Sequence, residues 1–572
     1  MSVPFRKPSV ALRPVPWAAS SIVTIALALF VQRVHAAGEE AVTLTPTRDP
    51  CNSCSRQVAQ AAAQPPQALP AVPAPQASFR LNDLRLNGAQ TLGNEELQAI
   101  TRTYIGREVT LADLESLAQA ITAKYRERGY FLAQAVVPVQ TVQGGVVEIS
   151  VIEGRLGKVD VLVAPDAPIS EARVRSFLAP LQPGQAVNSQ QYERTMLLLS
   201  DQPGVRVASG LQEGTEPGTT DLTVEVSAAS RWVFSAEADN HGTKESGRYR
   251  VGGTARWLSP FGIGDNMDLR AMVSDDGLWF GRAAYEAPIG ASGLRAGIGL
   301  ARVRYELGGQ FSDLDAQGRA DVFDLSVSYP VIRQRQQNLF LRLTADSKKL
   351  RDEMRAIDFT SNKRVRGLGL GWSWERRDEL WGGGYWASSG TLYRGKLDIR
   401  DAQSRAFDQG VGGRFTEGDF TKLTFLASRL QSIIPRHSLF LSVGGQWASK
   451  NLDASEKLSL GGARAVRAYS SSEALVDQGW IGTVEWRWSY NEELTPFVFY
   501  DAARGRLARD PGFFDTGSNH LSLRGFGLGV SWSRPGNFAI NATLAWRDGT
   551  RPAQTDGGGR NPRLFVQAQK SF

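Results

Sequence analysis

The sequence contains few of the residues that carry metal or redox chemistry: 2 cysteines and 4 histidines among 572 residues. After the first 36 residues only His241, His437 and His520 remain, and they stand far apart. They form neither the His-Glu-x-x-His pair of zinc hydrolases nor a nucleophilic triad. The sequence therefore argues against an enzyme, and we expect no catalytic residues, no metal and no cofactor.

Long hydrophobic runs and clusters of basic residues are also missing. Outside the N-terminus no window of about 20 apolar residues occurs, which excludes a helical membrane protein. The 65 Lys and Arg are interspersed with 58 Asp and Glu, so the net charge of +7 provides no clustered phosphate-binding surface, and we expect no nucleic-acid partner. The sequence is instead rich in aromatic residues and glycine, with 14 Trp, 25 Phe and 58 Gly. This combination favours extended β-structure with aromatic side chains on its surfaces.

Residues 1–36 have the pattern of a secretory signal peptide. Basic residues precede an apolar stretch over residues 18–31 that is too short to span a bilayer, and Val34-His35-Ala36 provides a small-residue cleavage site. The alternative is an N-terminal membrane anchor. We expect cleavage after Ala36 and a function outside the cytoplasm.

Residues 37–77 are rich in Ala, Pro and Gln and have few large apolar side chains, which predicts a linker. A short helix is expected within it over residues 55–63. Cys51 and Cys54 form a Cys-x-x-Cys pair in this linker. A zinc or redox site would need further ligands or a supporting scaffold, so we expect a local disulfide in an oxidising compartment.

Residues 78–154 and 155–228 repeat one αβ pattern. In each, a strand is followed by two helices and two further strands. The expected elements are 79–86, a helix from Asn94, a helix capped by Thr110, 131–137 and 145–152 in the first unit, and 157–163, 170–178, 189–200, 205–209 and 221–226 in the second. Repetition at this period predicts a tandem array of one structural unit.

Residues 229–572 lose helical spacing and alternate in polarity over segments of about ten residues. In the segment 480–490, for example, Val484, Trp486 and Trp488 would share one face, and Glu485 would lie on the other. A soluble sandwich shows the same alternation, but many tryptophans fall near segment ends, as in the interfacial girdles of membrane barrels. Sixteen such segments predict a 16-stranded antiparallel transmembrane β-barrel. The expected fold class is therefore α+β repeats followed by this barrel.

Several short motifs in the αβ units resemble the paired POTRA domains of TpsB transporters, the outer-membrane pores of two-partner secretion. These motifs are Gly129-Tyr130-Phe131, Val151-Ile152-Glu153-Gly154, Glu193-Arg194, and Asp201-Gln202-Pro203-Gly204-Val205. The resemblance extends over the whole mature chain and includes the haemolysin secretion/activation proteins of the ShlB, FhaC and HecB type. It implies two periplasmic POTRA domains, over 78–154 and 155–228, that bind the unfolded partner at a strand edge or groove.

The long connection at about 447–479, between the eleventh and twelfth segments, resembles the inward-folded sixth extracellular loop of this family. Gly461 and Gly462 precede Val466-Arg467-Ala468-Tyr469, in which Ala468 replaces the glycine of the family's Val-Arg-Gly-Tyr signature. In the family this arginine binds an aspartate of a Phe-x-Asp motif on the thirteenth strand, which here is Phe499-Tyr500-Asp501.

Alternation along this strand places Phe499 and Asp501 on the lumenal face. The resemblance thus implies a latch between Arg467 and Asp501 that holds the loop inside the pore. The alternative is an ordinary polar loop and an aspartate with unrelated partners.

The C-terminal segment ends in Phe572 and resembles the sorting signal of outer-membrane barrels, with Lys570 where an apolar residue is usual. This implies insertion into outer-membrane lipid by the barrel assembly machinery. The resemblance as a whole implies an outer-membrane translocator that secretes a large unfolded exoprotein of haemolysin or adhesin type with an N-terminal export domain. The alternatives are a BamA-like assembly factor and a passive porin.

Overall fold

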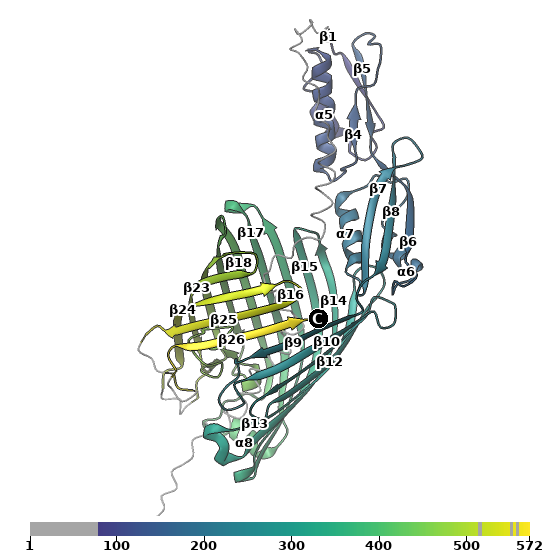
Figure 1. Cartoon of the computed structure of the whole chain (residues 1–572). Helices are drawn as coiled ribbons and strands as arrows, with labels where there is room; N and C mark the ends of the chain where they lie inside the picture. The colour runs from purple at the N-terminus through teal and green to yellow at the C-terminus, as the bar shows by residue number, and fades with distance from the viewer. Residues whose placement is uncertain (1–77, 513–516, 550–552, 556–559) are drawn as a thin grey trace, which may run out of the picture.

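The computed structural model describes residues 78–512, 517–549, 553–555 and 560–572. Two αβ units stand in tandem at one end of a closed β-barrel (Figure 1). The expected signal peptide and linker, including its helix, Cys51 and Cys54, lie outside the described residues. None of the described helices is both long and apolar enough to cross a membrane.

The first αβ unit packs two helices against a small sheet. Its strand order is β2-β5-β4, in which the first strand lies parallel to the last. The longer helix begins at Thr110 because the Thr110 hydroxyl accepts the Asp113 N–H while the Asp113 carboxylate accepts the Thr110 N–H. The elements are β1 Phe79–Arg80, β2 Asp83–Asn87, α4 Asn94–Thr101, β3 Glu108–Val109, α5 Leu111–Glu127, β4 Gln134–Val136 and β5 Val146–Ile152.

Two strand predictions for this unit are wrong in extent. The strand expected over 79–86 is divided, because the fully buried Leu81 turns into the core between β1, which pairs with β3, and β2, which pairs with β5. The strand expected over 131–137 is shorter, because the Ala133 N–H closes a turn onto the Tyr130 carbonyl before β4 begins.

The second unit repeats the topology of the first. Its sheet has the order β6-β8-β7, again with the first strand parallel to the last, so the predicted repeat is confirmed. Side-chain caps from Ser170 and Asn188 set the starts of its two helices. The elements are β6 Arg155–Val163, α6 Glu171–Leu178, α7 Ser189–Ser200, β7 Val205–Glu213 and β8 Thr219–Ala228.

A buried carboxylate, Glu153, lies at the junction of the two units. It accepts the Gln90 and Thr91 N–H groups at 2.7 and 2.6 Å and the Tyr125 hydroxyl at 3.0 Å. Arg155, the first residue of β6, lies 3.2 Å from its other oxygen. Burial would raise the pKa of Glu153, but these hydrogen bonds outweigh burial and hold the pKa below its ordinary value of 4.5.

We expect Glu153→Gln to lower the local opening free energy at Gln90 and Thr91 by about 1 to 3 kcal/mol at pH 7, because a charged acceptor is lost. A depressed carboxyl pKa contributes stability above the unfolded pKa and loses it as pH falls through the folded pKa. The difference between wild type and variant should therefore shrink below pH 4.5. Hydrogen exchange of the Gln90 and Thr91 amides, corrected for intrinsic rates, measures this difference in opening free energy. A difference that stays constant down to pH 3 would contradict this role.

The barrel has 16 antiparallel strands, β9 to β19 and β22 to β26, and closes by pairing β26 with β9, which confirms the predicted fold. The strands are β9 Trp232–Asp239, β10 Arg250–Leu258, β11 Asn266–Ser274, β12 Trp279–Pro288, β13 Arg295–Leu307, β14 Ala316–Arg333, β15 Gln337–Met354, β16 Phe359–Asp378, β17 Gly384–Ile399, β18 Gly418–Ile434, β19 His437–Ala448, β22 Gln478–Trp488, β23 Leu494–Arg506, β24 His520–Arg534, β25 Phe538–Arg547 and β26 Arg563–Ser571.

The outer surface of the barrel is apolar, whereas its inner surface carries many polar and charged side chains beside buried apolar ones. On β22 the exposed Val484, Trp486 and Trp488 alternate with the buried Glu485, as the sequence pattern predicts. Trp232 and Trp257 stack at 5.1 Å at the end of the barrel next to the αβ units, where an interfacial girdle is expected. The apolar exterior provides the surface that faces lipid.

The second αβ unit is bound to the barrel at the end of β14, just before the turn to β15. The Arg333 guanidinium donates to both carboxylate oxygens of Asp201, at 2.7 and 2.8 Å. Arg194 donates to the Pro330 carbonyl at 2.8 Å, and its guanidinium lies over the ring of Tyr329. The residues Arg194 and Asp201 of the quoted motifs thus serve to attach this unit to the barrel.

Candidate functional site

The connection over residues 449–477, between β19 and β22, is the longest in the barrel and lies against its inner wall. We call it the lumenal loop. It contains η4 Ala454–Glu456, β20 Leu458–Ser459 and β21 Leu475–Val476, and β20 pairs with β21 as the base of a hairpin. Its hairpin tip packs on the inward side chains of β23 and β24, including Phe499, Leu521 and Leu523. The loop therefore occupies the lumen.

Two glycines permit the tight tip of the lumenal loop. Gly462 has a φ of +112°, and its N–H donates to the carbonyls of Val466 and Tyr469. A Cβ at Gly461 would lie 2.2 Å from the Ser470 carbonyl oxygen, so only glycine fits there. Val466 and Tyr469 are almost fully buried on either side of Arg467, whose guanidinium points to the barrel wall.

The tip arginine binds the aspartate on β23 that the sequence singles out. The Arg467 guanidinium donates from Nε to Asp501 Oδ2 at 2.8 Å and from Nη2 to Oδ1 at 2.7 Å. The Arg467 backbone N–H donates to Oδ2 at 3.1 Å, and the guanidinium lies 3.4 Å from the ring centroid of Phe499. Asp501 is 0% exposed. The pair is thus a bidentate, desolvated contact stacked on an aromatic ring.

Arg467 and Asp501 have further partners that the two motifs do not indicate. Arg467 Nη1 donates to Glu485 Oε1 at 2.7 Å, and the Thr483 hydroxyl donates to Asp501 Oδ1 at 2.9 Å. Arg487 in turn donates to Glu485 at 2.6 Å. Alternation along β22 already places these three side chains on the lumenal face, but nothing in the sequence pairs them with the loop.

Ala468, where the family has glycine, fits without strain. Its backbone is outside the left-handed region. A Cβ built on Gly525 of β24 would lie 2.6 Å from the Ala468 methyl, so the glycine on the facing strand leaves room for this alanine.

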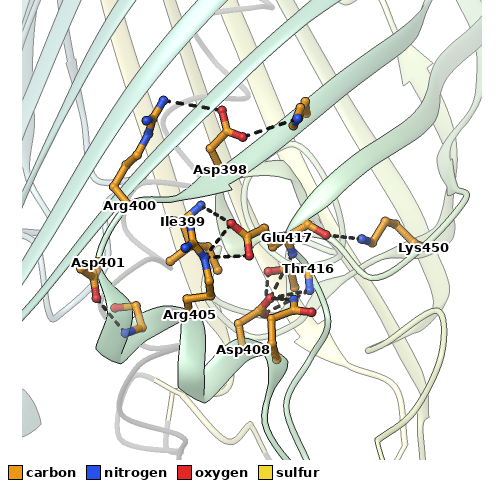
Figure 2. Close-up of polar contacts among 12 residues, drawn as sticks. Asp398, Ile399, Arg400, Asp401, Arg405, Asp408, Thr416, Glu417 and Lys450 are labelled. Atoms are coloured by element: carbon orange, nitrogen blue, oxygen red, sulfur yellow. Dashed lines mark hydrogen bonds and ion pairs between the residues drawn. The ribbon is translucent and has the colours of Figure 1, made fainter.

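The base of the lumenal loop is tied to neighbouring extramembrane loops. Figure 2 shows the connection between β17 and β18, where Asp401 caps α8 Ala402–Gln409 and Arg405 binds Glu417 at 3.1 Å. The Glu417 carbonyl then accepts Lys450 Nζ at 2.6 Å. This region lies at the end of the barrel opposite the αβ units (Figure 1).

Among the described residues, the one remaining predicted site residue is Phe572. Phe572 is exposed, and its N–H donates to the Phe234 carbonyl of β9 at 3.0 Å, beside the seam that closes the barrel. Within the described part of the chain, no group of three or more His, Cys, Asp or Glu side chains could hold a metal ion.

An apolar-coated barrel, a lumen occupied by an anchored loop and a tandem pair of αβ units define an outer-membrane protein translocator of the POTRA-barrel class. The family model "Haemolysin secretion/activation protein ShlB/FhaC/HecB" matches residues 218–532, and the ShlB-type POTRA domain model matches residues 79–154. The chain belongs to this ShlB/FhaC/HecB family, whose members are outer-membrane transporters that secrete exoproteins and hold their POTRA domains in the periplasm.

Individual relatives agree with the family. The heme/hemopexin transporter protein HuxB of Haemophilus influenzae is 28% identical over 470 residues, covering 80% of this chain and 81% of the relative. The outer membrane transporter CdiB of Dickeya dadantii is 22% identical over 429 residues, covering 72% of each chain. The solved structure of CdiB from Escherichia coli superimposes with a TM-score of 0.69 at 19% identity, covering 98% of this chain and 100% of that one, and so shares its fold.

Proposed function

We propose that this transporter exports one large unfolded exoprotein with an N-terminal export domain, and that the lumenal loop closes the pore until that substrate engages. The observation that carries the proposal is the contact of Arg467 with the buried Asp501 and Glu485, which fixes the loop tip inside the lumen. Relatives carry names that fit such a role, among them a heme/hemopexin transporter protein and a hemolysin transporter protein. The chain would act by moving a polypeptide and not as an enzyme.

The POTRA pair would capture the substrate before transport. The order β6-β8-β7 leaves β7 at an edge of its sheet, with backbone groups available for an added strand. Because Asp201 and Arg194 bind this unit to the barrel, a strand added there would lie close to the pore entrance.

The proposed division of the chain is a signal peptide over 1–36, a linker over 37–77, POTRA domains over 78–154 and 155–228, and a barrel over 229–572. The expected linker helix would obstruct the resting pore together with the loop. Barrel assembly machinery and outer-membrane lipid are the further partners of this scheme, and Phe572 would serve as the sorting signal.

Co-expression with a large, signal-bearing exoprotein encoded beside this gene tests the proposal. The exoprotein should appear in the culture medium only when both proteins are made, and should remain in the periplasm without the transporter. Equal export in both strains would contradict it. A general loss of outer-membrane proteins on depletion would favour a BamA-like factor, and a change limited to small-solute permeability would favour a porin.

A further inference from the structure

The lumenal loop carries a second set of buried charges, on its first limb and away from Arg467. Glu456 Oε1 lies 2.7 Å from Lys348 Nζ of β15, and Glu456 Oε2 lies 2.8 Å from Lys422 Nζ of β18. Asp453 lies 2.7 Å from Lys363 Nζ of β16. Two loop carboxylates thus bind three lysines from three strands of the wall.

These are not surface ion pairs. The side chains of Lys348 and Glu456 are 2% and 1% exposed. The ring of Tyr393 lies beside the ammonium groups of Lys348 and Lys422, at 5.3 and 5.8 Å. The neighbouring side chains include the buried, apolar Leu452 of the loop and two buried carboxylates, Asp346 and Asp352, which accept the Tyr393 and Tyr305 hydroxyls. Charges in such surroundings are costly unless paired, and breaking one pair is strongly destabilising.

The lysine contacts and the arginine contacts involve different strands. Lys348, Lys363 and Lys422 project from β15, β16 and β18, whereas Asp501 and Glu485 project from β23 and β22. The two sets share no residue, and they hold the beginning and the tip of the loop respectively. Release of the tip would leave the first limb attached.

We propose that Asp453 and Glu456, with Lys348, Lys363 and Lys422, form a second lock that holds the lumenal loop independently of Arg467, and that both locks must open for transport. This inference rests on the proposed function, in which departure of the loop opens the pore. The wall lysines are positioning residues for transport, because they act through the loop.

Release of the first limb is measurable at Leu452, which is 2% exposed. In a chain with Cys51→Ser and Cys54→Ser, Leu452→Cys provides a single thiol for an impermeant maleimide applied to intact cells. The combination Asp453→Asn with Glu456→Gln should raise the labelling rate at least about 10-fold, because it removes both loop carboxylates that the three buried lysines contact. The open probability in planar bilayers should rise when Arg467→Ala is added, because the tip contact otherwise holds the loop in the lumen.

Lys349→Gln is the matched control, because Lys349 lies next to Lys348 on β15 but points to the opposite, exposed face. It should leave labelling and open probability unchanged. Lys348→Gln with Lys363→Gln and Lys422→Gln neutralises the three wall lysines. It should raise the labelling rate as much as the change of the two loop carboxylates does. Heat-modifiable mobility on gels shows that each barrel has folded.

Swapping the two charges of the Asp453–Lys363 pair tests directly whether the ion pair holds the loop. Asp453→Lys and Lys363→Asp should each accelerate labelling, and together they should restore the slow rate. If the variants of the two loop carboxylates and of the three wall lysines fold but label at the wild-type rate, the second lock is overturned. Faster labelling without any change in conductance, in a chain that also carries Arg467→Ala, would support the second lock and contradict the proposed function, because the loop would then leave without opening the pore.

Discussion

Replacing Arg467 or Asp501 with alanine should reduce secreted exoprotein at least about 100-fold, to the level of cells that lack the transporter. Arg467→Ala leaves the buried Asp501 without its cation, and Asp501→Ala leaves Arg467 with Glu485 alone. Breaking such a buried pair costs about 3 to 5 kcal/mol, so the loop tip loses the fixed position from which the substrate would displace it. The bidentate geometry predicts that Arg467→Lys also fails, because an ammonium cannot reproduce two parallel hydrogen bonds. Immunoblots of medium and cells measure the effect.

Arg464→Ala is the matched control for this experiment. Arg464 is an exposed cation three residues before Arg467 in the same tip, so its loss changes the loop charge equally without touching Asp501. Its secretion should remain close to wild type, and the barrel should insert normally in all variants. Normal secretion from both Arg467→Ala and Asp501→Ala would contradict the latch.

Deletion of residues 79–226 should abolish export while leaving an inserted, conducting barrel. The barrel strands close without the POTRA units, whereas the proposed substrate-binding edge at β7 is removed. Secretion should fall to background, and conductance in planar bilayers should persist. Immunoblots of the culture medium measure the first, and recordings of the purified barrel measure the second.

A smaller change separates attachment from substrate capture. Arg194→Ala with Asp201→Ala removes the contacts to Pro330 and Arg333 but keeps β7 intact, so export should decrease without being lost. Export that survives the deletion of residues 79–226 would contradict a role of the POTRA pair and favour a passive channel.

Much of the fold was predictable because its signals are local. The repeated αβ pattern and the caps at Thr110 and Ser170 lie within short stretches of chain. In the barrel, the two-residue period of a strand determines the face on which each side chain lies, so Phe499 and Asp501 could be placed in the lumen from parity alone. The break at Leu81 was not predictable, because it depends on pairing with β3, which lies farther along the chain.

The chain's local patterns are therefore sufficient for the strand count and the lipid-facing surface, and the resemblance of two motifs to a known family adds one loop contact. The folded chain adds the partners of these groups. Glu485 joins Arg467 because β22 lies beside β23, and Glu456 meets Lys348 across 108 residues of sequence. Ion pairs of this kind have no periodicity or fixed spacing, because closure of the barrel brings their charges together from distant strands, so they become visible only in three dimensions.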